Sequence, residues 1–398
     1  MTGGVLLAGS YLINVVETSC PRWSASSTVY GESVLILVVG VVGLAHAYGV
    51  RRFGPTKYAL VGVVLAAASL ALSGGMISAC NERSPHVRFL TEVVYVLSFA
   101  FLGVALGFVY FSSIECLLAA FPRRPGFASG VCSLGYGVGG VVYGQFFLAL
   151  EHLYRRDVID VPSIFYSAGI LTVLMASVSI PFVRRPVHSP EPSKASKASD
   201  NPKKGIARWV IKRPKFWLIY WARTVVLLPG WGITARLKDI LIAAWHHNEN
   251  PPIELLSGLV MGFYIGGRLL WLLICDRVGG KNLWVLTTGI QIVSLGFLPW
   301  FMYHTGSWGC YASIGALCAF MLAFSAPKAT VAAFIHDIFK LAHLVTLIIG
   351  YLSPGAGIGG LVGPLTAEWF FKRFGNFEYF FYTSCGLLTS GLFILTCI

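Results

Sequence analysis

The stretch Phe263–Asn282, "FYIGGRLLWLLICDRVGGKN", is an apolar run that contains one arginine, Arg268, and ends in a charged, glycine-rich turn. An arginine at the centre of a membrane helix costs roughly 2.5–3.5 kcal/mol on insertion scales, so it is normally buried in protein or faces water. The stretch therefore predicts a membrane helix whose central arginine has either a structural or a ligand-binding role.

The composition extends this prediction to the whole chain. Its 398 residues are 56% hydrophobic and 12% charged, whereas soluble domains carry about 25% charged residues. A membrane-spanning helix needs about 20 apolar residues. We therefore predict an all-α polytopic membrane protein with twelve transmembrane helices. The predicted crossings are 3–19, 30–50, 57–78, 91–119, 127–150, 162–183, 216–240, 255–275, 283–303, 308–333, 341–364 and 376–397.

The net charge of +13 is distributed in a way that argues against nucleic-acid binding. Ten of the thirty Lys and Arg residues lie between Arg184 and Lys215, in the one long polar segment. The positive-inside rule places that segment in the cytoplasm. Eighteen Lys and Arg residues then lie inside and nine outside, and both termini are cytoplasmic. The chain is expected to be a multi-pass protein of the lipid bilayer, in the plasma membrane rather than an internal one.

The first apolar run begins almost at Met1 without a basic segment before it, so we interpret it as a membrane helix and not a signal peptide. The nine cysteines are scattered singly and lack metal-ligand spacing, so no metal or cofactor is expected. Cys20, Cys80 and Cys310 fall near the outer face, where a disulfide is conceivable but the sequence does not select a pair.

An internal repeat relates the two halves of the chain. "SLGYGVGGVV" at 133–142 matches "SPGAGIGGLV" at 353–362, and "RRFG" at 51–54 matches "DRVG" at 276–279 with a similar offset. The matches place the fifth crossing on the eleventh and the second-to-third loop on the eighth-to-ninth. They predict two parallel six-helix repeats, 1–183 and 216–398, joined by a basic cytoplasmic linker at 184–215. Transporters with two such halves bind substrate near mid-membrane between them.

The glycines of "GYGVGG" satisfy a dinucleotide-binding pattern, but that pattern requires a preceding strand and a soluble βαβ unit. Here the motif lies inside an apolar helix. Small residues at this density allow membrane helices to pack closely. We interpret the motif, together with Gly103 and Gly107 of the fourth crossing, as helix packing.

These residues resemble a known family. "GRLLWLLICDRVGGK" and its first-half copy "YGVRRFGPTK" are similar to the loop signature of the major facilitator superfamily, over essentially the whole chain. Residues 106–140, "LGFVYFSSIECLLAAFPRRPGFASGVCSLGYGVGG", resemble the oxalate:formate antiporter family, as do the second-helix region and "IGYLSPGAGIGGLVGP". Related monocarboxylate carriers share much of this narrower pattern.

The resemblance implies that Arg268 is the carboxylate-binding arginine of the eighth helix. Arg268 precedes Asp276 by eight residues, which places it about 12 Å above the cytoplasmic loop, near mid-membrane. Tyr264 and Trp271 share its helix face, and its planar guanidinium can meet a carboxylate bidentately. The alternatives are that Arg268 pairs with an inward-facing acid such as Glu115, or extends toward the membrane surface.

The sequence departs from the family at two points. A dicarboxylate carrier of this type pairs its arginine with a lysine in the eleventh helix, yet no Lys or Arg occurs between Leu341 and Phe371. A second cation must then come from Lys328 or Arg223, which could equally reach toward the inner face. If neither reaches the cavity, a monovalent anion is favoured over oxalate. Arg51 also stands where the loop signature usually has an acid.

Further candidates are weaker. Glu115 could carry a proton or balance an arginine, although structural pairing is favoured, and His46 is interpreted as a packing histidine. The motif Pro229-Gly230-Trp231-Gly232 is expected to break the seventh crossing, with Trp231 either lining the cavity or anchoring at the interface. The remaining candidate lining residues are Tyr11, Tyr136 and Tyr351. The predicted gating-loop residues are Arg52, Gly54, Asp276, Arg277 and Gly279.

The leading functional prediction is a carrier that moves a small carboxylate by alternating access, driven by a counter-anion or a proton, and functional as a monomer. A carrier for amino acids or other small organic solutes is the alternative within transport, and Glu115 in the same cavity would favour it. A non-transporting sensor on a carrier fold is a further alternative. An enzyme is not expected, because the sequence has no paired carboxylates, His cluster or nucleophile-and-base set.

Overall fold

The computed structural model describes most of the chain, and every regular element in the described part is a helix. The described residues are 16, 20–21, 23, 27–80, 84–154, 161–180, 183, 210–245, 252–304, 307–340 and 345–398. Ten helices in these ranges are long and apolar enough to cross a membrane. The first predicted crossing, 3–19, and the candidate Tyr11 lie outside the described residues, Val16 excepted.

The helices overlap the predicted crossings, but some ends differ: α4 begins at Pro85 and not at 91, and α16 ends at Phe374 and not at 364. The first group is α2 (Ser27–Phe53), α3 (Pro55–Ser78), α4 (Pro85–Ala120), α5 (Pro125–Tyr154) and α6 (Val161–Ser179). The second group is α9 (Pro214–Ala235), α10 (Leu237–Ala244), α11 (Ile253–Val278), α12 (Gly280–His304), α13 (Ser307–Phe324), α14 (Ala326–Ala329), α15 (Val331–Phe339), α16 (Val345–Phe374) and α17 (Glu378–Cys397). Several of them begin at proline, which lacks an N–H and has a backbone angle suited to the first helical position.

Two helix interruptions in the structure differ from the prediction. Pro229 lies inside α9 and does not end it; the helix ends at Ala235, and Arg236 separates it from α10. The tenth crossing, predicted as one helix over 308–333, instead divides into α13, α14 and α15. Pro327 has no N–H to donate within that segment, so the helix is interrupted there.

The repeated loop signature has the same backbone in both copies. Gly54 separates α2 from α3 with a φ of 78°, and Gly279 separates α11 from α12 with a φ of 88°. Positive φ values of this kind favour glycine, because a Cβ atom would be strained there. We call the end of the molecule that carries Gly54 and Gly279 the glycine-turn end.

Two helix pairs make the most extensive contacts between the groups, and the internal repeat relates these pairs to each other. Helix α2 packs along α16, and α5 packs along α11. Where α2 meets α16, a Cβ atom added to Gly357 would lie 2.8 Å from the Leu37 carbonyl oxygen, and one added to Gly40 would lie 2.6 Å from that of Ser353. In the same way, a Cβ atom at Gly103 of α4 would lie 2.6 Å from the Leu35 carbonyl oxygen. The glycine-rich segments therefore serve close helix packing, as predicted.

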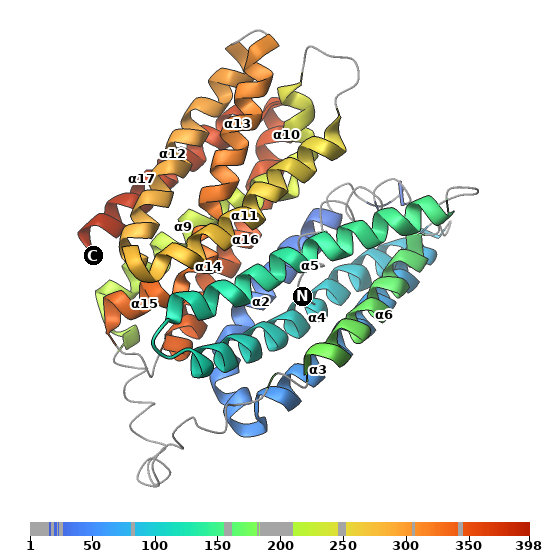
Figure 1. The fold of residues 1–398 in the computed structure, drawn as a ribbon. Coiled ribbons are helices and arrows are strands. Elements are labelled where there is room, and N and C mark those ends of the chain that lie inside the picture. Colours follow the sequence, from blue (N-terminus) through green and yellow to red (C-terminus); the bar gives the residue numbers. More distant parts are fainter. Residues whose placement is uncertain are drawn as a thin grey trace.

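Each group of helices has its own buried cluster of apolar side chains. One cluster is built from residues between Val16 and Ala168, and the other chiefly from α9 to α17 with Phe111, Ile114 and Cys132 added. The two groups approach each other at the glycine-turn end, where α15 packs against α5, and diverge toward the opposite end (Figure 1). The boundaries at residues 183 and 215 stay predictions.

A disulfide joins Cys20 to Cys80 at the end opposite the glycine turns. It connects the segment before α2 to the end of α3, with the two Cα atoms 5.8 Å apart. The sequence indicated three candidate cysteines and could not select the pair. Cys310, the third candidate, is a free thiol.

Candidate functional site: a cationic cavity between the two helix groups

A cavity lies between the two groups of helices, with about 810 Å³ of space free of protein atoms when the open solvent at its mouth is included. Helices α2, α4 and α5 line it on one side, and α9, α11, α14 and α16 line it on the other. The lining residues are Ile36, Val39, Gly40, Tyr110, Phe111, Ser133, Tyr136, Arg223, Leu227, Trp231, Arg268, Lys328, Ser353, Ala356 and Gly357.

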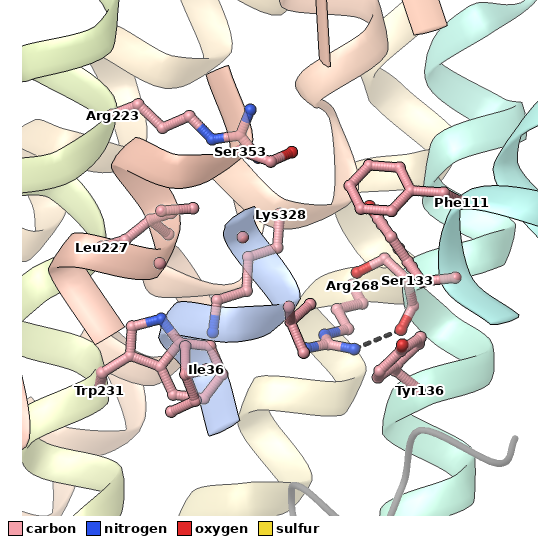
Figure 2. Close-up of a pocket in the computed structure, with 15 residues that line it drawn as sticks. Ile36, Phe111, Ser133, Tyr136, Arg223, Leu227, Trp231, Arg268, Lys328 and Ser353 are labelled. Carbon is pink, nitrogen blue, oxygen red and sulfur yellow. Dashed lines mark hydrogen bonds between the residues drawn. The ribbon is translucent and has the colours of Figure 1, made fainter. Parts of the chain in front are cut away.

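Three cationic side chains line the cavity, and these lining residues include no aspartate or glutamate. Arg223 comes from α9, Arg268 from α11 and Lys328 from α14 (Figure 2). They are the three cations that the sequence placed at membrane depth. Like charges in an apolar surrounding repel one another, so the empty cavity strongly favours a negative charge at its centre.

Arg268 is 4% exposed and is held from two sides. One terminal nitrogen donates a hydrogen bond to the backbone carbonyl of Ser133 on α5, and the other donates to the hydroxyl of Tyr264, one turn earlier on α11. The Tyr264 ring also lies under the guanidinium, 4.4 Å from its carbon atom. The guanidinium is therefore pre-oriented at the contact between α5 and α11.

Lys328 is held by aromatic rings. Its ammonium nitrogen lies 3.4 Å from the ring centre of Trp231 and 4.0 Å from that of Phe324. The Tyr264 hydroxyl accepts a hydrogen bond from it at 2.9 Å, and so it bridges Lys328 and Arg268. Cation–π contacts of this kind stabilise a desolvated ammonium by roughly 2 kcal/mol. They offset part of the cost of burying an ammonium group that has no carboxylate partner among the lining residues.

Arg223 has the least complete set of contacts of the three cations. It is 7% exposed, and its Nε and one terminal nitrogen are buried without a hydrogen-bond partner among the described residues. A buried charged group left unpaired is costly. Because Arg223 lines the cavity, an anion bound there is the natural partner for these donors.

The other predicted residues fall in and around the cavity. Trp231 and Tyr136 line it, and the Tyr136 hydroxyl donates to the Leu106 carbonyl at 3.2 Å. Trp271 instead donates from its ring N–H to the Leu322 carbonyl, 2.7 Å away on α13, so it joins two helices. Tyr351 is partly buried on α16 and packs against the larger cluster. Neither Trp271 nor Tyr351 is among the lining residues.

Glu115 lies outside the cavity, beside His46. Its carboxylate oxygen is 3.4 Å from the His46 Nε2, between α2 and α4. The His46 ring packs between Tyr58 and Phe111, with ring centres 5.8 and 4.9 Å away, which agrees with its interpretation as a packing residue. The recorded partners of Arg268 are Ser133 and Tyr264, so the predicted alternative of an Arg268–Glu115 pair is not observed.

Sequence reasoning missed two polar lining residues, Ser133 and Ser353. Both line the cavity, and they occupy the same position, the first, in the two copies of the repeated pattern. The repeat itself was therefore the signal that could have identified them. Tyr110 and Phe111, which lie in the α4 segment that carries the family resemblance, were also not selected.

The predicted gating residues gather at the glycine-turn end. The Asp276 carboxylate accepts hydrogen bonds from the backbone N–H groups of Gly126 and Phe127, each at 3.1 Å, at the start of α5. A carboxylate at a helix N-terminus is favoured by the helix dipole. Ser129 adds a 2.8 Å hydrogen bond to the Ala329 carbonyl. Arg277 is exposed, and the Arg52 side chain lies outside the described residues.

Comparisons with known proteins agree with this architecture. The family model of the Major Facilitator Superfamily matches residues 22–346. An MFS-type transporter of Aspergillus fumigatus is 24% identical over 370 residues, which cover 87% of this chain and 78% of that protein. A bacterial homologue of the iron transporter ferroportin, solved in an outward-facing state, aligns with a TM-score of 0.68 at 13% identity, over 99% of this chain and 96% of that one.

Two further solved structures share the fold. The Escherichia coli fucose:proton symporter aligns with a TM-score of 0.62 at 12% identity, covering 99% of this chain and 97% of that one. A proton:xylose symporter aligns with a TM-score of 0.65 at 14% identity, over 99% and 93% of the two chains. The helices and the central cavity thus define a polytopic membrane transporter. The chain belongs to the major facilitator superfamily.

The Asp276 contact gives a first prediction. Asp276→Asn removes the charge from the start of α5 and leaves one acceptor oxygen in place of two. At an exposed position a charge–dipole contact contributes up to about 1 kcal/mol, which corresponds to roughly a fivefold change in an equilibrium. We expect transport by reconstituted protein to fall by about that factor. Glu254→Gln, the same acid-to-amide change at an exposed position in the first turn of α11, is the control, and an equal loss in both variants would contradict the assignment.

Proposed function

We propose that this protein is a secondary carrier for small organic anions, and that a carboxylate of the substrate binds at Arg268. The observation that carries the proposal is the cavity with three buried or half-buried cations and no acidic lining residue. Arg268 supplies a planar fork that matches a carboxylate, and its orientation is fixed by Ser133 and Tyr264. Lys328 and Arg223 supply further positive charge.

The arrangement of the cations bears on the valence of the substrate. The sequence left open whether Lys328 or Arg223 reaches the cavity, and both line it in the structure. Their presence supports an anion with more than one negative charge, or two anions bound in succession. Lys328 and Arg223 are also the candidates for the second cation, which the family pattern would place in the eleventh helix.

Alternating access follows from the way in which the two groups of helices meet. They are in contact at the glycine-turn end, through Asp276 and Ser129, and diverge at the other end (Figure 1). The charge distribution predicts that the glycine-turn end is cytoplasmic. The Cys20–Cys80 disulfide at the opposite end supports that orientation, since disulfides persist on the oxidising side of a membrane. The conformation described here is then the outward-facing one.

The amino-acid alternative has lost its main support. An ammonium group would need an acidic partner in the cavity, and Glu115, the candidate for that role, pairs with His46 instead. The residues that line the cavity include no aspartate or glutamate. The two proton symporters of the same fold carry sugars. Their sequences are only 12–14% identical to this chain, so the comparison supports a shared fold and not a shared substrate.

The test is counterflow of labelled anions into proteoliposomes that contain the purified protein. The panel is formate, oxalate, lactate and pyruvate, with one zwitterionic amino acid as the comparison. We expect exchange of at least one carboxylate and none of the amino acid. Exchange of the amino acid alone would overturn the proposal, and so would a complete absence of flux from protein that remains monodisperse and thermally stable.

A further inference from the structure

A second cluster of charges lies outside the anion cavity, at the end opposite the glycine turns. Its centre is Arg236, between α9 and α10. One terminal nitrogen of Arg236 pairs with Glu368 of α16, and the other lies 3.1 Å from the Asp239 carboxylate. Lys372 reaches the second oxygen of Glu368 at 2.8 Å. These two cations and two carboxylates balance one another.

Glu32 of α2 faces this cluster as an additional acid. It is 3% exposed, and its Oε2 is buried with no hydrogen-bond partner in the described part of the chain. Arg236 is close enough to interact with it electrostatically, yet that guanidinium is already engaged by two other carboxylates. From α4, the Tyr95 ring packs against the neighbouring Gly31 position. Within the described part of the chain, an ionised Glu32 would therefore be a buried charge without a hydrogen-bonded counter-ion of its own.

Burial of an isolated carboxylate anion is so costly that such a group usually takes up a proton and becomes neutral. Glu32 also occupies the cavity-facing side of α2. Ile36 and Gly40 follow it at intervals of four residues and both line the anion cavity. Residues at this spacing share a helix face, and one step of four residues advances about 6 Å. Glu32 thus lies about one turn beyond the cavity, toward the open end.

We propose that Glu32 is a proton-binding site that couples anion transport to the proton gradient. The inference rests on the proposed function of the cavity and adds the co-transported species. In the conformation described here, a proton from the medium at the open end binds a carboxylate oxygen of Glu32 and gives the neutral acid. When the open end closes and α2 approaches Arg236, the acid releases that proton to the other side and the carboxylate pairs with the guanidinium.

The sign of the coupling follows from the charges. Positive charges in the empty cavity favour the ionised form of Glu32. An anion bound among Arg223, Arg268 and Lys328 cancels their field at Glu32, so the carboxylate then binds a proton more tightly. By reciprocity, a protonated Glu32 increases the affinity of the cavity for the anion. Proton and anion therefore bind together, which makes the carrier a symporter of the two.

The first arm of the test needs no substrate. Infrared difference spectra of the purified protein, recorded as the pH is changed, are expected to contain a protonated-carboxyl band that Glu32→Gln removes and Glu32→Asp retains. Glu254→Gln is the matched control, since Glu254 is an exposed acid near the same end of the molecule. Loss of the band in Glu115→Gln rather than in Glu32→Gln would move the proton site to the His46–Glu115 pair and overturn the proposal.

The second arm measures uptake of the same four labelled carboxylates into proteoliposomes under an inward proton gradient. Uptake by the unmodified protein should rise as the external pH falls, toward about tenfold per pH unit in the limit of one bound proton. Glu32→Gln should abolish this response, while Glu254→Gln retains it. If the unmodified protein exchanges anions at a rate that does not depend on the proton gradient, the proposed proton site is wrong and the proposed anion carrier still holds. A Glu32 band without any flux would overturn the carrier and the coupling.

Discussion

Replacement of Arg268 by lysine is expected to reduce carboxylate counterflow by roughly 10- to 150-fold. The substitution keeps the positive charge and removes the planar fork. It also removes the hydrogen bonds to the Ser133 carbonyl and the Tyr264 hydroxyl that fix the orientation of the charge. A hydrogen bond in which one partner is charged contributes about 1.5–3 kcal/mol, and each 1.4 kcal/mol is a factor of ten in affinity.

The measurement is counterflow in proteoliposomes, with the amount of folded protein checked by size-exclusion chromatography. Arg373→Lys is the matched control, because it makes the same chemical change at an exposed position in the last turn of α16. Arg373→Lys should transport normally. Full uptake by Arg268→Lys would show that the cavity needs only a positive charge at this position, and would remove the bidentate contact from the proposal.

Much of the fold could be predicted from the sequence because a membrane restricts what a chain can do. Spanning segments must be apolar and helical, so each predicted crossing in the described part is helical, although α16 extends to Phe374 and the tenth crossing is divided. Loop residues with special backbone requirements were equally informative. Gly54 and Gly279 occur at matching positions of the repeat, and both have positive φ values.

The breaks in α9 and in the tenth crossing could not be placed in this way. Proline removes one hydrogen bond, but neighbouring helices decide whether the helix ends there. Pro229 is accommodated within α9, whereas the segment around Pro327 divides into short helices. Lys328 lies in that short segment, and its position against Trp231 depends on the break.

The site was predictable only in part. The depth of Arg268 follows from its distance to the loop, and its contact with Tyr264 follows from helical spacing. Trp271 has the same kind of spacing from Arg268, yet its ring N–H bonds to α13. Helical spacing predicts which face of a helix a side chain occupies, but it does not predict which neighbouring helix packs against that face. Glu32 and Glu368 are acids inside apolar runs, a signal that was present in the sequence and was not used.

The close approach of α2 and α16 gives the prediction with the second large effect. A Cβ atom at Gly357 would lie 2.8 Å from the Leu37 carbonyl oxygen and 3.3 Å from the Cα of Gly40, and both neighbours are backbone. Gly357→Ala therefore forces the two helices apart at the wall of the cavity. Because this contact joins the two groups of helices on which alternating access depends, we expect counterflow to fall at least about tenfold, a change of roughly 1.4 kcal/mol or more.

The matched control is Gly262→Ala in α11, where an added Cβ atom meets nothing within 4 Å. Alanine is a better helix former than glycine by about 1 kcal/mol, so this variant should be as stable as the unmodified protein or slightly more stable. Thermal stability and counterflow are measured on both variants. If Gly357→Ala is as stable as the unmodified protein but does not transport, the substitution blocks the conformational cycle and does not impair folding. Normal transport by Gly357→Ala would show that the α2–α16 contact can loosen without affecting the cycle.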